Sequence, residues 1–115
     1  MEKFAIAHYG EERPLKATDG ERAIFEIIVD IVNEGGFPTE PIRFVRKSDS
    51  YVSAVMGPTD IARFKWTDRA KWIQLPYSLD GKTKHPLESP EDIREYENEI
   101  LGHYFMAFGH TLLGY

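Results

Sequence analysis

One segment of the chain is bounded at both ends by signals typical of a helix. Thr18 is followed three residues later by Glu21, a pair that forms a capping box in which each side chain bonds the other residue's backbone N–H. Aliphatic residues then recur at helical spacing and predict one buried stripe: Ile24, Ile27, Ile28, Ile31 and Val32. Gly35-Gly36 ends the segment, because glycine adopts the left-handed C-terminal conformation without a steric penalty. A chain with this stripe must supply another apolar surface on which the helix packs.

The periodicity changes to two residues after Pro38 and Pro41. β-Branched and aromatic residues separated by turn residues predict four strands, at residues 42–45, 51–56, 61–66 and 71–75. Because the connections are short, successive strands are expected to be antiparallel. Residues 4–9 fit either a short strand or an extended arm, and the segment 77–87 is predicted to be a loop.

A second helix is predicted to begin near Ser89. This serine is a favourable N-cap, Pro90 loses no hydrogen bond at the first helical position, and the acidic residues that follow suit the positive end of the helix dipole. Apolar residues then keep helical spacing: Ile93, Tyr96, Ile100, Leu101, Tyr104, Phe105, Phe108 and Leu112. His103 and His110 fall beside this stripe, which predicts their partial exposure.

These elements predict a single α+β domain spanning residues 1–115, with element order αββββα and an antiparallel meander of three to four strands. Both helices need an apolar partner and the sheet has one apolar face, so we expect both helices to pack on that face. In the third strand, alternation directs one set of side chains towards the helices: Ala62, Phe64 and Trp66. It directs the intervening set towards solvent: Ile61, Arg63 and Lys65.

The chain of 115 residues contains no cysteine, which excludes disulfides, zinc–thiolate sites, iron–sulfur clusters and cysteine nucleophiles. A domain of this size buries enough surface to fold without such links, and the absence of disulfides favours a reducing, cytoplasmic location. The N-terminal apolar run is soon broken and Glu11-Glu12 follow, so we expect no signal peptide. The most apolar stretch, residues 104–115, is far shorter than the ~20 residues that span a bilayer, so we expect a soluble protein without membrane contacts.

Basic residues concentrate in the middle of an otherwise acidic chain. Residues 41–71 carry seven Lys or Arg against three Asp or Glu, a local charge of +4 within a net charge of −5. Six of these cations are predicted to share the outer face of the sheet or the strand ends beside it: Arg43, Lys47, Arg63, Lys65, Arg69 and Lys71. With Tyr51 or Trp72 as stacking platforms, such a face suits single-stranded nucleic acid. The competing interpretation is a solvated sheet face whose charges suppress edge pairing.

The arrangements that suggest catalysis or metal binding are weaker than their structural explanations. Asp60 and Asp80 suit a nuclease, yet both lie in turn sequences. Glu99 and His103 share a helix face, but a single pair at this spacing is typical of a surface contact. No glycine-flanked elbow supports a triad of Ser53, His85 and Asp80. We therefore predict no catalytic residue, no metal and no cofactor.

The second helix carries more apolar surface than one small sheet covers. The surplus is predicted to form a dimer or partner interface: Phe105, Phe108, Leu112, Leu113 and Tyr115. The alternative is that the whole stripe belongs to the core. The sequence thus predicts a non-catalytic interaction or regulatory domain that forms homodimers through its C-terminal helix. Nucleic-acid binding through the basic sheet face is the alternative function.

Overall fold

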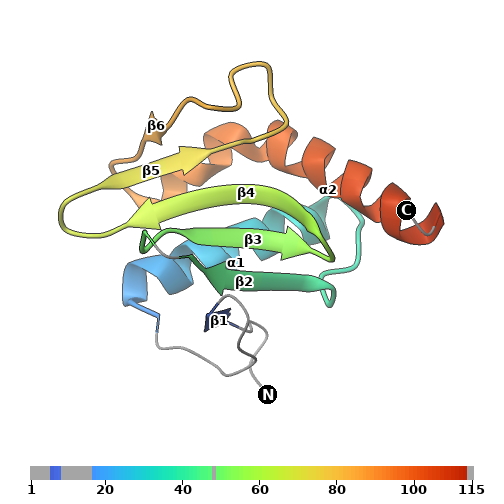
Figure 1. Ribbon diagram of the computed structural model, residues 1–115, viewed down its shortest axis with the longest axis horizontal. Helices are drawn as coiled ribbons and strands as arrows, with labels where there is room; N and C mark the ends of the chain where they lie inside the picture. Colours follow the sequence, from blue (N-terminus) through green and yellow to red (C-terminus); the bar gives the residue numbers. More distant parts are fainter. Residues whose placement is uncertain (1–5, 9–16, 48, 114–115) are drawn as a thin grey trace.

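The strands of the sheet lie side by side in the order in which they occur in the chain (Figure 1). The computed structural model describes residues 6–8, 17–47 and 49–113, and side chains within 17–47 and 49–109. Its elements are β1 (Ile6–His8), α1 (Asp19–Glu34), β2 (Ile42–Arg46), β3 (Val52–Met56), β4 (Thr59–Trp66), β5 (Lys71–Gln74), β6 (His85–Pro86), the 3-10 helix η1 (Pro90–Tyr96) and α2 (Glu97–Leu113). Strands β2 to β6 form an antiparallel meander. The predicted α+β domain, with an antiparallel meander between two helices, is confirmed, and the meander has five strands rather than the predicted three to four.

Two short strands extend the predicted meander at its edges. β1 pairs parallel to β2, with Ile6 opposite Phe44, so residues 6–8 form a strand rather than an extended arm. A parallel pair needs a crossover connection, which α1 supplies. β6 pairs antiparallel to β5 inside the segment that was predicted to be a loop. Its Pro86 has no N–H to donate, which suits an edge strand.

Helix α1 is capped as its sequence predicts. The Thr18 hydroxyl accepts a bond from the Glu21 N–H at 3.2 Å, and the Glu21 carboxylate accepts one from the Thr18 N–H at 3.0 Å. At the other end, Gly36 has a φ of 86°, the left-handed conformation that glycine adopts without strain. Gly20 is needed for a different reason, because a Cβ there would lie 2.1 Å from Nε1 of Trp66.

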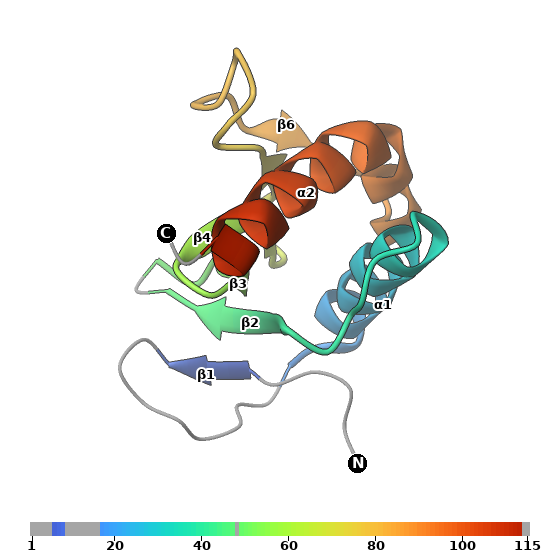
Figure 2. The same cartoon turned by 90° about the vertical axis from the view of Figure 1, so that its right-hand side faces the viewer.

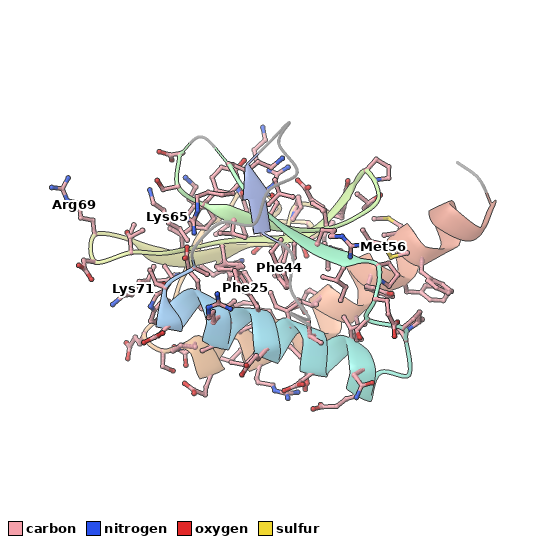
Figure 3. All side chains as sticks on the ribbon, turned by 90° about the horizontal axis from the view of Figure 1, so that it is seen from below. Phe25, Phe44, Met56, Lys65, Arg69 and Lys71 are labelled. Carbon is pink, nitrogen blue, oxygen red and sulfur yellow. The ribbon has the colours of Figure 1, made fainter. Side chains whose placement is uncertain are left out.

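Both helices cover the same face of the sheet (Figure 2), as the amphipathic pattern predicted. Phe25 of α1 stacks on Phe44 of β2 with ring centroids 4.2 Å apart, and meets Phe64 of β4 edge-on at 5.7 Å. Figure 3 shows Phe25 and Phe44 between α1 and the sheet. Tyr104 of α2 is completely buried, and its hydroxyl donates to the carbonyl of Pro38. The core therefore joins both helices to the central strands.

A β-bulge interrupts the alternation of β4. The pairing register shifts between Ala54 and Val55 of β3, and Ile61 of β4 is the residue that it skips. Ile61 is completely buried, so the prediction that it faces solvent was wrong. Its carbonyl oxygen lies 2.9 Å from Nδ1 of His103. The prediction that His103 is partly exposed was also wrong, since 7% of this residue is exposed.

The second predicted helix begins as the 3-10 helix η1 before it continues as α2. The Asp92 carboxylate accepts bonds from the N–H groups of Glu88 and Ser89 at 2.8 and 3.1 Å, which lowers the pKa of Asp92. The Ser89 hydroxyl donates to the same carboxylate at 3.3 Å. Arg94 then ties η1 to α1 through two bonds to the Glu34 carboxylate, at 2.7 and 2.8 Å.

Candidate functional site

The face of the sheet that points away from the helices carries a row of aromatic and basic side chains. Lys65 of β4 pairs with Trp72 of β5, and Trp72 pairs in turn with Pro86 of β6. Tyr51 immediately precedes β3 and, by the register of β3 with β4, falls in line with Lys65. The row therefore crosses the sheet perpendicular to its strands.

The two aromatic rings contact each other across β4. Their centroids are 5.9 Å apart, although two strand spacings of ~4.8 Å separate β3 from β5. The rings must therefore incline towards each other above the position of Lys65, whose side chain is 19% exposed. The ammonium group of Lys84, in the loop before β6, lies 4.8 Å from the centroid of Trp72. We refer to Tyr51, Lys65, Trp72 and Lys84 as the aromatic–lysine row.

Acidic and carbonyl groups already engage part of the positive charge on this face. Arg63 donates from Nε and Nη2 to the Asp60 carboxylate, at 2.8 and 2.6 Å. Arg43 donates to two backbone carbonyls, at 2.7 and 3.0 Å. The Lys65 ammonium is 4.0 Å from Asp49, whose side chain is 75% exposed, and a contact of this kind in water contributes little. The exposed ammonium group of Lys84 therefore remains available to a ligand, whereas the Lys65 side chain is mostly buried.

The six predicted cations do not gather at one place. Three of them occupy strand positions that alternate to the outer face: Arg43, Arg63 and Lys65. Lys47 lies directly after β2, and Arg69 lies at the tip of the hairpin between β4 and β5 (Figure 3). Lys71 lies instead on the helix side, with its ammonium group 4.8 Å from the ring centroid of Trp66. Figure 3 shows Lys65 and Lys71 on opposite sides of the sheet.

Sequence reasoning missed Lys84, because its segment was predicted to be an unpaired loop. The Gln74 side chain donates to the carbonyl of Lys82 at 3.2 Å, and this bond holds the loop against β5. The spacing of Lys82 and Lys84, two residues apart next to a strand, was the signal available in the sequence.

Arg46, another basic residue of β2, turns towards the helices rather than to the outer face. Its guanidinium donates two bonds to the Glu21 carboxylate, at 2.9 and 2.8 Å. The Glu21 side chain is 2% exposed and that of Arg46 is 19% exposed. Burial acts to raise the pKa of Glu21, but the bonds from Arg46 and from the Thr18 N–H outweigh it and lower the pKa. This ion pair joins the start of α1 to the end of β2.

Four aromatic residues gather where α2 passes the loop after α1. Phe37 is central, with the ring centroids of Tyr104, Phe105 and Phe108 at 5.3, 6.0 and 5.9 Å. Phe108 is partly buried, whereas Phe105 is 65% exposed. We refer to Phe37, Tyr104, Phe105 and Phe108 as the aromatic cluster. The other predicted interface residues lie outside the described side chains: Leu112, Leu113 and Tyr115.

Of the residues considered for catalysis, the structure brings Asp80 and His85 into contact, while Asp60 has a separate partner. Asp60 accepts from Arg63, and Asp80 lies 3.2 Å from Nε2 of His85. Ser53 is completely buried in β3, and its hydroxyl has no hydrogen-bond partner within the described part of the chain. Within residues 17–47 and 49–109, no group of three or more His, Asp or Glu residues is arranged to hold a metal ion.

No helix among the described residues is long and apolar enough to cross a membrane. Comparison of the chain with protein-family models, with curated proteins and with solved structures found no significant match in any of the three. The molecule offers two candidate surfaces, the aromatic–lysine row on the sheet and the aromatic cluster beside α2.

Proposed function

We propose that this domain is a non-catalytic interaction module that self-associates through the C-terminal part of α2. The observation that carries the proposal is the exposure of Phe105, 65% of which is in contact with solvent although the ring belongs to the aromatic cluster. Phe37 and Phe108 beside it are partly buried, so they support the ring without covering it. An apolar surface of this kind is typical of a protein interface.

A second copy of the chain is the partner that this surface fits best. From Ile100 onwards α2 contains no Asp, Glu, Lys or Arg, whereas Glu97 and Glu99 lie in its first turn. If two α2 helices pack antiparallel around Phe105, each acidic first turn faces the uncharged half of the other helix. The two acidic ends then stay apart, and a two-fold axis brings the same apolar patch against itself. A reducing compartment such as the cytosol suits a domain without disulfides, and we propose that self-association takes place there.

The expected strength follows from the exposed area of Phe105. Full burial of a phenylalanine side chain contributes about 1.5–3 kcal/mol, so burying the exposed part contributes about 1–2 kcal/mol per copy. A symmetric dimer counts this contribution twice, which gives about 2–4 kcal/mol. Phe105→Glu removes it and adds like charges across the axis. We therefore expect the dissociation constant of the dimer to rise at least about 30-fold.

The test is the molar mass in solution, measured by sedimentation or light scattering from about 1 μM to about 1 mM. The wild-type chain should pass from monomer to dimer in this range, while Phe105→Glu should remain monomeric. Leu79→Glu is the matched control, because Leu79 is a fully exposed apolar residue outside the aromatic cluster. Circular dichroism should show the same fold for all three proteins. A wild-type chain that is monomeric throughout, or equal losses in both variants, contradicts the proposal.

A further inference from the structure

We infer that the aromatic–lysine row is a binding site for single-stranded nucleic acid. The row combines, on one side of the sheet, the two chemistries that this ligand requires: rings that stack on bases and ammonium groups that neutralise phosphates. It shares no residue with the aromatic cluster, so this function is independent of the proposed self-association.

The rings of the row are held by the sheet and still partly exposed. Trp72 belongs to β5, which is paired on one side with β4 and on the other with β6. Tyr51 is fixed next to β3, because the carbonyl of Tyr51 accepts a bond from the Lys47 N–H at 2.9 Å. Both residues are half-buried, so their contact at 5.9 Å orders the rings without enclosing them. A base that stacks on this pair meets a surface that is already in place.

The lysines of the row stand where phosphates attached to a stacked base would pass. Lys84 is exposed, and its contact with the Trp72 ring is weak enough for the ammonium group to move to a phosphate. By register, Lys65 belongs to β4, the strand between those that carry the two rings, and its ammonium group has a long contact with the exposed Asp49. The acidic helices lie on the opposite face, so the row presents positive charge away from them. This distribution complements a polyanion laid across the strands.

The aromatic pair favours a single strand over other polyanions. An acidic peptide would use the lysines but would gain little from two inclined rings. A duplex keeps its bases stacked on one another and cannot offer their faces to Tyr51 and Trp72. Single-stranded DNA and RNA share the chemistry that the row recognises, and contacts to the 2′-hydroxyl would distinguish them.

The experiment measures binding of fluorescein-labelled single-stranded DNA and RNA of about 12 nucleotides by anisotropy, between about 20 and 200 mM salt. Tryptophan fluorescence is recorded in parallel, because a base stacked on Trp72 should quench it. Trp72→Leu should weaken binding at least about 5-fold and remove the quenching. Lys84→Gln should weaken binding and reduce the slope of log affinity against log salt by about 0.7, the value for one phosphate contact on a single strand.

Lys71→Gln is the matched control. Its ammonium group lies 4.8 Å from a tryptophan ring, as that of Lys84 does, but on the helix side of the sheet. This variant should bind like the wild-type chain, and saturable, salt-sensitive binding with this pattern supports the site for either DNA or RNA. Absence of binding at about 20 mM salt overturns the inference, as do equal losses in Lys71→Gln and Lys84→Gln. Competition by polyglutamate as effective as that by unlabelled DNA, without quenching of Trp72, would identify a surface for acidic proteins and would also overturn it.

Discussion

Removal of Arg46 is expected to destabilise the fold more than neutralisation of Glu21, although both changes break the same ion pair. Arg46→Ala leaves the Glu21 carboxylate, which is 2% exposed, without its cation. Glu21→Gln leaves the Arg46 guanidinium, which is 19% exposed and therefore within reach of water. Arg46→Ala therefore leaves an unpaired anion in a buried environment, whereas Glu21→Gln leaves an unpaired cation at a position that water reaches.

The magnitudes follow from these exposures. Breaking a buried ion pair from one side costs about 3–5 kcal/mol, and water at Arg46 places Arg46→Ala near the lower end, at about 3 kcal/mol. Glu21→Gln keeps an oxygen for the Thr18 N–H and loses the charge-assisted bonds, which costs about 1–2 kcal/mol. Replacing both residues by leucine leaves no unpaired charge. The lost capping bond then lowers the free energy of unfolding by about 1 kcal/mol.

Acid should reduce the difference in the free energy of unfolding between the wild-type chain and Arg46→Ala. In the wild-type chain the pKa of Glu21 lies below its ordinary value of 4.5, so its contribution to stability is present above pH 4.5 and is lost as the pH falls through the lowered pKa. In Arg46→Ala burial remains and the cation is gone, so the pKa of Glu21 in the folded state is higher than in the wild-type chain. As the pH falls, protonation neutralises this buried carboxylate and removes the energetic cost of its unpaired charge.

The assay is urea-induced unfolding, followed by circular dichroism at about pH 7 and about pH 4. Arg69→Ala serves as the control, because Arg69 is exposed at a hairpin tip and its loss should change the free energy of unfolding by less than about 0.5 kcal/mol. Two results would contradict this explanation: a loss of unfolding free energy in Glu21→Gln as large as that in Arg46→Ala, or a larger difference between the wild-type chain and Arg46→Ala in acid. Either would mean that the unpaired buried carboxylate is not the main cause of the destabilisation.

Two further changes test the packing of the helices. Gly20→Ala places a methyl group 2.1 Å from Nε1 of Trp66, so overpacking should lower stability by about 1–3 kcal/mol despite the better helix propensity of alanine. A melting temperature at or above that of the wild-type chain would contradict this steric explanation. Tyr104→Phe keeps the buried ring but removes the hydroxyl that donates to Pro38, and should cost about 1 kcal/mol in urea unfolding. An unchanged midpoint would mean that this hydrogen bond adds nothing to stability.

Sequence signals within one turn of the chain were sufficient to predict the helix ends, because short-range contacts define these ends. The capping box at Thr18 and the glycine that ends α1 act within one turn of the chain, so they can be recognised without knowledge of the fold. The sequence also offered Tyr51 or Trp72 as an aromatic platform on the outer face, and in the structure the two rings contact each other. These predictions required nothing beyond the period of the element in which each residue lies.

The features that sequence reasoning missed depend on contacts between distant segments. The bulge at Ile61 is accompanied by a contact with His103 on α2, 42 residues later, and the local pattern around Ile61 reads as a regular strand. Lys71 belongs to the helix side because its hairpin pairs it with Trp66, a register that the turn sequence does not reveal. Lys84 reaches Trp72 because of the path of its loop.

The parallel pairing of β1 with β2 also sets an order of assembly. From β2 to β5, each strand meets the next after a short connection, so the entropy of closing these hairpins is small and they can form early in folding. β1 joins only across α1, since Ile6 pairs with Phe44, 38 positions further along the chain. We therefore expect β1 to dock last as the chain folds and to detach first when the native state opens. Among the described strands, the backbone amides that join β1 to β2 should therefore exchange with solvent first.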